Sequence, residues 1–351
     1  MSLRPLYGHE PIRAKIAGSI ARGRFPQAAL FVGGRGVGKQ RLALWTAQAF
    51  LCDGSGTKPC GSCISCRQVV AMGHPDAHWF VPIERLQTAD TDRQMEEVRG
   101  LLAADVAARV ADGLWAPPEG MVGHPLASMH VLQHIVSRTP FAAPRKVIIL
   151  GDAERLVVQE SSLEAANALL KVLEEPPADT TIILTAEHPH ALLPTIMSRL
   201  VPLRVPALQE TDLEAFAKAE LALEGPRLEH LLPRARGSIG ELVRLVRGPN
   251  APEEAADALW ECVRRGDGAW LAEALPRNHY GARGELQPLL DALARRIRTH
   301  TAELARGGNR EAIKNSIRAL KRVEAARAET RVNVNPQLAV AVLAGELERL
   351  L

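Results

Sequence analysis

Aromatic residues and a surplus of either charge are scarce in this sequence. Phe, Trp and Tyr make up 4% of its 351 residues, and the formal net charge is only +3. A protein that binds nucleic acid on its own usually carries a clustered basic surface and aromatic side chains that stack on bases, so this composition disfavours that class. Hydrophobic residues make up 46% and charged residues 24%, which is typical of a globular protein of two or three domains at this length.

Long apolar segments are also missing. No apolar run approaches the roughly 18 residues that a membrane-spanning helix needs, and the N-terminal segment lacks the apolar core of a signal peptide. We therefore expect a cytoplasmic protein with no membrane partner. Cysteine is scarce as well, but four of the five cysteines lie within 52–66. In a reducing compartment this clustering favours a metal site over disulfides.

Two kinds of pattern divide the chain. Up to about residue 206, short apolar runs alternate with helical patterns, and this order predicts an α/β fold with a parallel sheet covered by helices. The predicted strands are 28–32, 146–150, 180–185 and a short strand that ends at 205. Beyond Pro206 only helical patterns follow, with a Pro/Gly/Asn-rich boundary at 247–255.

Two further segments belong to the α/β part. Ser161 and Glu164 form a capping box, which predicts that a helix begins there, and Pro176 ends it. Residues 83–125 have the pattern of a helix followed by a Pro/Gly loop. Nothing in that segment indicates a chemical role.

The segment FVGGRGVGKQ has the spacing of a phosphate-binding loop. Gly33, Gly36 and Gly38 lie between a predicted strand and a predicted helix, and Lys39 follows. Backbone N–H groups, the helix N-terminus and the lysine of such a loop can bind phosphates. The next residue is normally a Ser or Thr that holds Mg²⁺, but here it is Gln40, whose longer amide suits the tight octahedron of Mg²⁺ poorly. Binding of ATP or ADP stays open, as does a tight turn without a ligand.

The acidic side of a hydrolytic site is also incomplete. If the strand 146–150 ends at Leu150, the position that normally holds the metal carries Gly151, and only Asp152 follows. Asp152 is equally suited to cap the next helix. Because Gln40 and Gly151 remove two supports of the metal together, we expect neither magnesium nor efficient ATP hydrolysis in this chain.

The cysteine cluster predicts a zinc site. Cys52, Cys60, Cys63 and Cys66 follow the pattern C-x7-C-x2-C-x2-C, with glycines and a proline between them that allow tight turns. Four thiolates suit tetrahedral Zn²⁺ and leave no open position, so the ion would be structural. The alternative is four separate buried or free cysteines. Cys262 lies on a predicted helix and is expected to be a core residue.

Taken in order, these segments resemble the clamp-loader branch of the AAA+ proteins. The resemblance covers about residues 5–205. It rests on LYGHE, LFVGGRGVGK, the cysteine segment, HPDAHWF, KVIILGDAERL, EAANALLKVLEEPP, TIILTAEHP and LLPTIMSRL. Two kinds of subunit are relevant in that family: a gamma/tau-like kind that hydrolyses ATP and a delta-prime-like kind that largely does not. Gln40, Gly151 and Gly240, the last standing where the ATPases carry a lid arginine, make this chain resemble the delta-prime-like kind most.

The resemblance implies three domains and one residue that acts on a neighbour. The domains would be a RecA-like AAA+ domain over 1–206 with the zinc module at 52–66, a three-helix lid over 207–247 and a helical collar over 248–351. Arg199, which alone would read as a surface ion-pair residue, corresponds to the family's arginine finger. That residue reaches the γ-phosphate of ATP in the next subunit. The family usually has Cys after this arginine, where this chain has Leu200.

The implied partners are those of a replicative clamp loader. They are gamma/tau-type and delta-type subunits in a five-subunit ring, the sliding clamp, and primer-template DNA reached through the complex. As a component of the DNA polymerase III holoenzyme, the chain would help to load the clamp. Two alternatives stay open: an ATP-hydrolysing gamma/tau-type subunit, and a zinc-containing DNA-binding protein that works alone.

Overall fold

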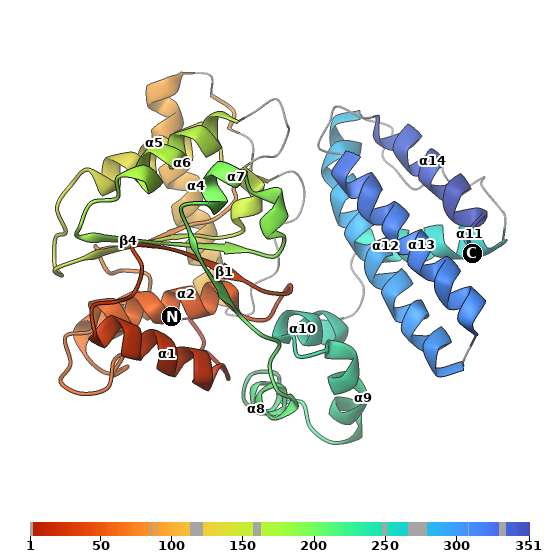
Figure 1. The fold of residues 1–351 in the computed structure, drawn as a ribbon, viewed down its shortest axis with the longest axis horizontal. Coiled ribbons are helices and arrows are strands. Elements are labelled where there is room, and N and C mark those ends of the chain that lie inside the picture. The colour runs from red at the N-terminus through yellow and green to blue at the C-terminus, as the bar shows by residue number, and fades with distance from the viewer. Residues whose placement is uncertain are drawn as a thin grey trace. The chain divides into compact units, whose positions relative to one another are not determined.

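The computed structural model separates the chain into two compact units (Figure 1). The residues it describes are 3–84, 86–88, 90–112, 122–156, 163–247, 251–265, 279–307, 309–329 and 335–351. The first unit, here called the sheet unit, runs to Arg247. The second, the helical unit, contains the helices from Ala251 onward.

The sheet unit is built on five parallel strands in the order β2-β3-β4-β1-β5. Their bounds are β1 Ala28–Val32, β2 Ala77–Phe80, β3 Lys146–Leu150, β4 Thr180–Ala186 and β5 Val201–Arg204. The predicted parallel sheet is thus confirmed, with the four predicted strands present. β2 was not predicted, because four residues that include a histidine give almost no strand pattern.

Helices cover both faces of this sheet (Figure 1). They are α1 Glu10–Ala21, α2 Lys39–Leu51, α3 Ile64–Val70, α4 Thr91–Asp112, α5 Leu126–Val136, α6 Glu164–Glu174 and α7 Pro194–Met197, with 3-10 turns at η1 Ala153–Leu156 and η2 Pro189–Ala191. Alternate strand residues point to opposite faces. Phe31 and Ile149 therefore belong to the core with α1 and α2, whereas Leu30 and Ile148 belong to the core with α5 and α6. β1 and β3 are buried on both faces, which explains the apolar runs in their sequences.

The predicted helix start at the capping box falls partly outside the described residues. Ser161 is one of the residues left undescribed, and α6 begins at Glu164 with Leu163 in the position before it. The helix ends at Glu174, before Pro176 as predicted. Within 83–125 the helix is α4, and much of the loop after it is outside the described residues.

Three short helices follow the sheet and form a small core of their own. They are α8 Glu210–Leu221, α9 Pro226–Ala235 and α10 Ile239–Arg247, here called the lid helices. Leu213, Phe216, Leu232 and Leu242 are buried among them. These helices belong to the same compact unit as the sheet, so their separation as a domain of 207–247 stays a prediction.

The helical unit contains only helices among its described residues, as predicted. They are α11 Ala251–Arg265, α12 His279–Gly307, α13 Arg310–Glu329 and α14 Pro336–Glu348. They pack around Trp260, Leu293, Val323 and Leu347. Cys262 on α11 is buried, as expected. Across the described parts of both units, no helix combines the length and the apolarity that crossing a membrane requires.

Candidate functional site

The glycine-rich loop lies between β1 and α2. Gly36 has φ 71° and Gly38 has φ 98°, left-handed conformations that glycine adopts without strain. Gly38 immediately precedes Lys39, the first residue of α2. The loop therefore delivers the lysine and the helix N-terminus to the carboxyl edge of the sheet, as a phosphate loop does.

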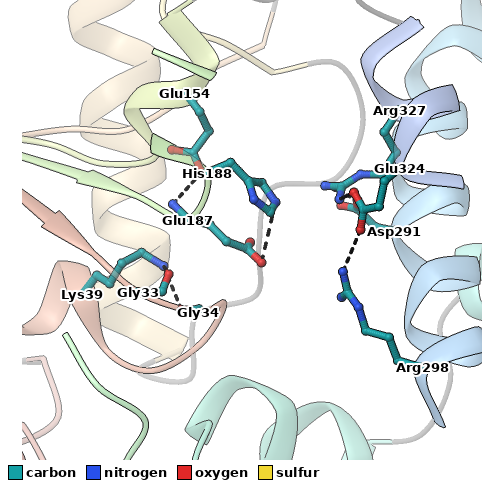
Figure 2. Close-up of polar contacts among 10 residues, drawn as sticks. All are labelled: Gly33, Gly34, Lys39, Glu154, Glu187, His188, Asp291, Arg298, Glu324 and Arg327. Atoms are coloured by element: carbon teal, nitrogen blue, oxygen red, sulfur yellow. Dashed lines mark hydrogen bonds and ion pairs between the residues drawn. The ribbon is translucent and has the colours of Figure 1, made fainter. Parts of the chain in front are cut away.

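The lysine of the loop is turned back onto the loop itself. Its Nζ donates to the carbonyl oxygens of Gly33 (3.0 Å) and Gly34 (2.9 Å), and the side chain is only 7% exposed (Figure 2). Burial lowers the pKa of Lys39, against the opposing charges of Glu187 and Asp152. Two of its three donors are thus already used inside the protein.

Gln40 and Gly151, which replace the expected metal-binding hydroxyl and acid at two distant positions of the sequence, are in contact. The Gln40 Oε1 accepts a hydrogen bond from the Trp79 indole N–H at 3.0 Å, and the glutamine is 5% exposed. A Cβ placed on Gly151 would lie 2.4 Å from that oxygen. The glutamine amide therefore fills the space that an acidic side chain at 151 would need, and the residues present do not fit a magnesium ion.

Gly240 also contacts the loop directly. Its N–H donates to the carbonyl oxygen of Gly36 at 3.1 Å, and a Cβ on Gly240 would lie 2.7 Å from the Gly36 Cα. Beside it, the Ser238 hydroxyl donates to the carbonyl oxygen of Arg35 at 2.9 Å. The lid helix α10 thus begins on the phosphate loop, and glycine at 240 is what allows this approach.

The N-terminal segment joins the same loop to α8. His9 Nε2 lies 2.7 Å from the Val37 carbonyl oxygen. Tyr7 donates its hydroxyl to Glu220 at 2.7 Å, and Arg4 forms an ion pair with the same carboxylate. Burial and the bond to Glu220 raise the pKa of Tyr7 to about 12. The lid helices are therefore fixed to the loop from two sides.

Several carboxylates lie close enough to Lys39 to influence its charge. The Glu154 Oε1 accepts from the backbone N–H of Glu187 at 2.9 Å (Figure 2), and its Oε2 is buried with no hydrogen-bond partner among the described residues. Burial, followed by the charge of Asp152, raises the pKa of Glu154 to about 7. His124, 2.8 Å from the Gly151 carbonyl oxygen, has its pKa lowered to about 4 by burial. Acidic groups next to the lysine disfavour a polyanionic phosphate.

Arg199 lies at the opposite edge of the sheet from this loop. The β5 residue Val201 pairs with Ala29 near the start of β1, so Arg199 stands at the amino edge of strands whose carboxyl edge carries the loop. Its guanidinium binds the Glu174 carboxylate (2.7 Å) and the Thr195 carbonyl oxygen (2.8 Å), and 34% of its side chain is exposed. Arg199 is thus not brought together with its own phosphate loop.

The residue after this arginine has a packing role. Leu200 is 6% exposed and belongs to the core that α5 and α6 form with the sheet. Its replacement of the family's cysteine therefore places an apolar side chain in a core and leaves the charge of Arg199 unaffected.

The four clustered cysteines converge at the end of α2. Their Sγ atoms all lie within 4.8 Å of one another. The separations are 3.9 Å between Cys52 and Cys63 and 4.0 Å between Cys60 and Cys66. Tetrahedral zinc with Zn–S bonds of about 2.3 Å requires sulfur separations of about 3.8 Å. The cluster can therefore hold a metal ion such as zinc.

The backbone favours the thiolate form of one of these cysteines, Cys60. N–H groups of Cys63 and Ser62 lower the pKa of Cys60 to about 6, whereas burial raises the pKa of Cys66. A cation that binds all four would offset the second effect. Gly54 also matters, because a Cβ there would lie 2.8 Å from the Cys60 sulfur.

Several residues of these sites were not singled out in the sequence. Trp79 holds Gln40, and Glu174 holds Arg199. Glu154 and Glu187 lie near the lysine. The segments that contain all four were among those carrying the family resemblance, but their partners lie far away in the sequence and no local pattern marks them.

Comparisons with known proteins find relatives among the subunits of DNA polymerase III. The delta′ subunit of DNA polymerase III from Bacillus subtilis is 29% identical over 242 residues, which is 69% of this chain and 60% of that protein. The delta′ subunit from Pseudomonas aeruginosa is 31% identical over 219 residues, 62% of this chain and 55% of that protein. The tau subunit of DNA polymerase III from Salmonella typhimurium is 29% identical over 244 residues, 68% of this chain and 31% of that protein.

These relatives are matched only in part. The chain spans between 55% and 60% of the length of the two delta′ relatives. The family model described as DNA polymerase III, delta subunit, matches residues 8–209, more than half of the chain. That stretch contains the sheet, the phosphate loop, the cysteine cluster and Arg199. The chain therefore belongs to the DNA polymerase III, delta subunit, family.

Proposed function

We propose that the chain is a delta-prime-type subunit of a bacterial replicative clamp loader. In this role it assembles with gamma/tau-type and delta-type subunits into a five-subunit ring in the cytoplasm. The ring loads the sliding clamp onto primed DNA. In that process the chain acts as a rigid subunit of the ring and supplies one arginine to a neighbouring subunit. It does not hydrolyse ATP itself.

The observation that carries the proposal is the packing of Gln40 against Gly151. The amide lies 2.4 Å from where a side chain at 151 would begin, so the metal-binding hydroxyl and the metal-binding acid are both replaced by a single buried contact. Lys39 adds to this, because its Nζ already donates to Gly33 and Gly34. A hydrolytic centre needs a metal and a free cation at the phosphates, and the described residues at this loop offer neither a magnesium site nor a free lysine.

Arg199 supports a role across a subunit interface. It stands at the edge of the sheet opposite the chain's own loop, so the phosphate it serves would belong to another subunit. A partly exposed ion pair such as that with Glu174 is worth about 1 kcal/mol or less, and the guanidinium exchanges it for a γ-phosphate at little cost. An arginine in this position stabilises the charge that develops on the transferred phosphoryl group.

The ion in the cysteine cluster is proposed to be zinc with a structural role. All four ligands are thiolates, so no coordination position is left for substrate or water. The cluster links the end of α2 to α3, and the ion would hold that connection closed.

Reconstitution of the ring tests the proposed function. The chain is mixed with the gamma/tau-type and delta-type subunits, and loading of the clamp on primed circular DNA is followed with and without it. We expect loading to require the chain, and the isolated chain to show no ATP turnover. Turnover by the isolated chain that Lys39→Met abolishes would instead identify an ATP-hydrolysing gamma/tau-type subunit. Tight, salt-sensitive DNA binding by the isolated chain would favour a protein that works alone.

A further inference from the structure

The Arg199 side chain is folded back onto groups of its own chain. Its Nη2 binds the Glu174 carboxylate at 2.7 Å, and its Nη1 donates to the Thr195 carbonyl oxygen at 2.8 Å and to the Ser198 hydroxyl at 3.4 Å. Thr195 lies four residues before Arg199, so the side chain runs back along the short helix α7. The guanidinium is thus directed at acceptors of this chain, although it is partly exposed.

The carboxylate that binds Arg199 stands at an unfavourable place in its own helix. Glu174 is the last residue of α6, where the helix dipole and the unpaired carbonyl groups disfavour a negative charge. Its side chain is 49% exposed, and Arg199 is its one ion-pair partner among the described residues. A carboxylate in this place does not stabilise α6, so its effect falls on Arg199.

The packing of α6 against α7 does not depend on this ion pair. Leu173, Ile196 and Leu200 come from the two helices and the residues that follow them, and all three are buried in the same core. An ion pair between partly exposed side chains is worth far less than such burial. The pair can therefore open, or lose its charge, while both helices keep their places.

A γ-phosphate and the Glu174 carboxylate would compete for the same guanidinium. Arginine binds carboxylates and phosphates through the same planar fork of N–H donors. In the structure, Glu174 and Thr195 each bind one nitrogen of that fork. Because a phosphate has to displace the carboxylate before it can use both nitrogens, Glu174 reduces the fraction of Arg199 that is available to it.

A second cation near Glu174 eases this exchange. Lys171 is exposed and lies three residues before Glu174 in α6, a spacing at which helical side chains meet. When Arg199 leaves, Lys171 can pair with the carboxylate. The restraint on the guanidinium is therefore weak enough to be reversed by a phosphate.

The geometry favours retention of Arg199 over its presentation to a neighbour. A carboxylate that presented the guanidinium would hold it away from the surface, with the other donors pointing outward. Here the two further acceptors, Thr195 and Ser198, belong to the turn that precedes Arg199, and only 34% of the arginine side chain is exposed. The observed conformation is therefore a retained one.

We propose that Glu174 restrains the arginine finger, by retaining the Arg199 guanidinium on this chain until the γ-phosphate of ATP in the neighbouring subunit displaces it. The inference rests on the proposed function, which assigns Arg199 to that phosphate. It adds a positioning residue that acts through Arg199 and lowers the rate of ATP hydrolysis by the ring.

The test measures steady-state ATP hydrolysis by the reconstituted ring with DNA and the clamp. Glu174→Gln keeps the size of the side chain and removes its charge. We expect kcat to rise about two- to fivefold, because an exposed pair holds the guanidinium by a small factor only, while KM for ATP stays within about twofold. In an Arg199→Ala background the same change should have no effect, since Glu174 acts through the arginine. Ring assembly and thermal unfolding, measured in parallel, should match the wild type.

Glu175→Gln is the matched control. It removes the same charge from the next residue, which is also exposed but is not the residue that binds Arg199, and it should leave kcat unchanged. An equal rise in Glu175→Gln would mean that any loss of negative charge at this place speeds hydrolysis, and it would overturn the proposal. An unchanged or lower kcat in Glu174→Gln would overturn it as well, and a lower value would mean that Glu174 presents the arginine.

The outcome for Arg199→Ala separates this inference from the proposed function. If Arg199→Ala did not lower hydrolysis by the ring, the arginine would not serve a neighbour, and both would fail. If it lowered hydrolysis while Glu174→Gln left the rate unchanged, only the restraint by Glu174 would fail.

Discussion

At the scale of single residues, Gln40 and Gly151 share one space, and this makes their energies interdependent. The Gly151 backbone has no left-handed φ, so alanine there is unfavourable only through its contact with the Gln40 amide. Gly151→Ala should therefore lower the free energy of unfolding by about 1–3 kcal/mol, as overpacking does. In a Gln40→Ser background the same change should cost less than half as much.

A double-mutant cycle with urea unfolding measures this coupling. Gln40→Ser alone is also expected to destabilise, because it leaves the buried Trp79 indole N–H without its acceptor at 3.0 Å. The coupling between positions 40 and 151 should be at least about 1 kcal/mol. Strict additivity would contradict the shared space and with it the main argument against magnesium.

Glu154 predicts a pH dependence of stability. Burial raises its pKa from the usual 4.5 to about 7, so between these values the unfolded chain releases a proton that the folded chain retains. Stability is therefore lost as pH rises from about 4.5 to 7, by about 3 kcal/mol from this residue. His124 has its pKa lowered to about 4, so its contribution to the free energy of unfolding increases as pH rises over much of the same range. In the wild type this increase masks the loss that comes from Glu154.

The comparison with Glu154→Gln isolates this residue, since both proteins contain His124. The free energy of unfolding of the wild type minus that of the variant should fall between pH 4.5 and 7 and stay constant above. A difference that does not vary with pH would mean that Glu154 is ionised in the folded protein at pH 5.

The residues that stood out in the sequence were those that break a chemical pattern. Gln40, Gly151 and Gly240 could each be recognised as a missing metal ligand, acid or cation. Their contacts with one another and with Gly36 could not be predicted, because they join segments that only the folded sheet and lid bring together. Glu154 breaks no pattern, and only its burial reveals it.

At the scale of elements, the close packing of the start of α10 against the phosphate loop depends on two glycines, Gly36 and Gly240. Gly240→Ala would place its Cβ 2.7 Å from the Gly36 Cα, which is backbone and cannot rotate away. We expect the lid helices to shift, with a loss of about 1–3 kcal/mol and faster hydrogen exchange in the amides of 208–247. The sheet should keep its protection.

Gly100→Ala is the matched control for that change. Gly100 lies within α4, and a Cβ there meets nothing within 4 Å, so alanine should stabilise the helix by about 0.5–1 kcal/mol. Equal exchange rates in Gly240→Ala and the wild type would show that α10 does not rest on the loop.

Elements were predictable where periodicity was long or burial was complete. β3 and β4 are buried along their whole length, and each contains an apolar run, at 147–150 and 182–184. β2 was missed because it has only four residues and one of them is a histidine, and it pairs with β3 in the folded sheet. The convergence of the cysteines was predictable because their spacing is local, whereas the hydrogen bond from Trp79 to Gln40 joins segments that lie far apart in the sequence.

At the scale of the whole molecule, Lys39 and Arg199 should differ in their effect on ATP hydrolysis by the ring. Arg199 should matter and Lys39 should not. Lys39 bonds to its own loop, and Arg199 stands at the other edge of the sheet, partly exposed and bound to Glu174 and to the Thr195 carbonyl oxygen. Arg199→Ala should therefore lower the DNA- and clamp-stimulated ATPase of the ring, because an arginine finger is worth roughly 10³-fold or more at the site it serves. Lys39→Met should change that rate less than about twofold, since in the proposed function no phosphoryl transfer takes place at its loop.

Steady-state ATP hydrolysis by rings assembled with each variant distinguishes these roles, with ring assembly checked in parallel. Arg199→Lys should recover part of the rate at most, because a single ammonium group cannot reproduce the planar guanidinium fork. A loss in Lys39→Met as large as that in Arg199→Ala would place catalysis in this chain's own loop. The proposed division, in which this chain stabilises charge for a neighbour while its own site is closed by Gln40, requires the opposite order.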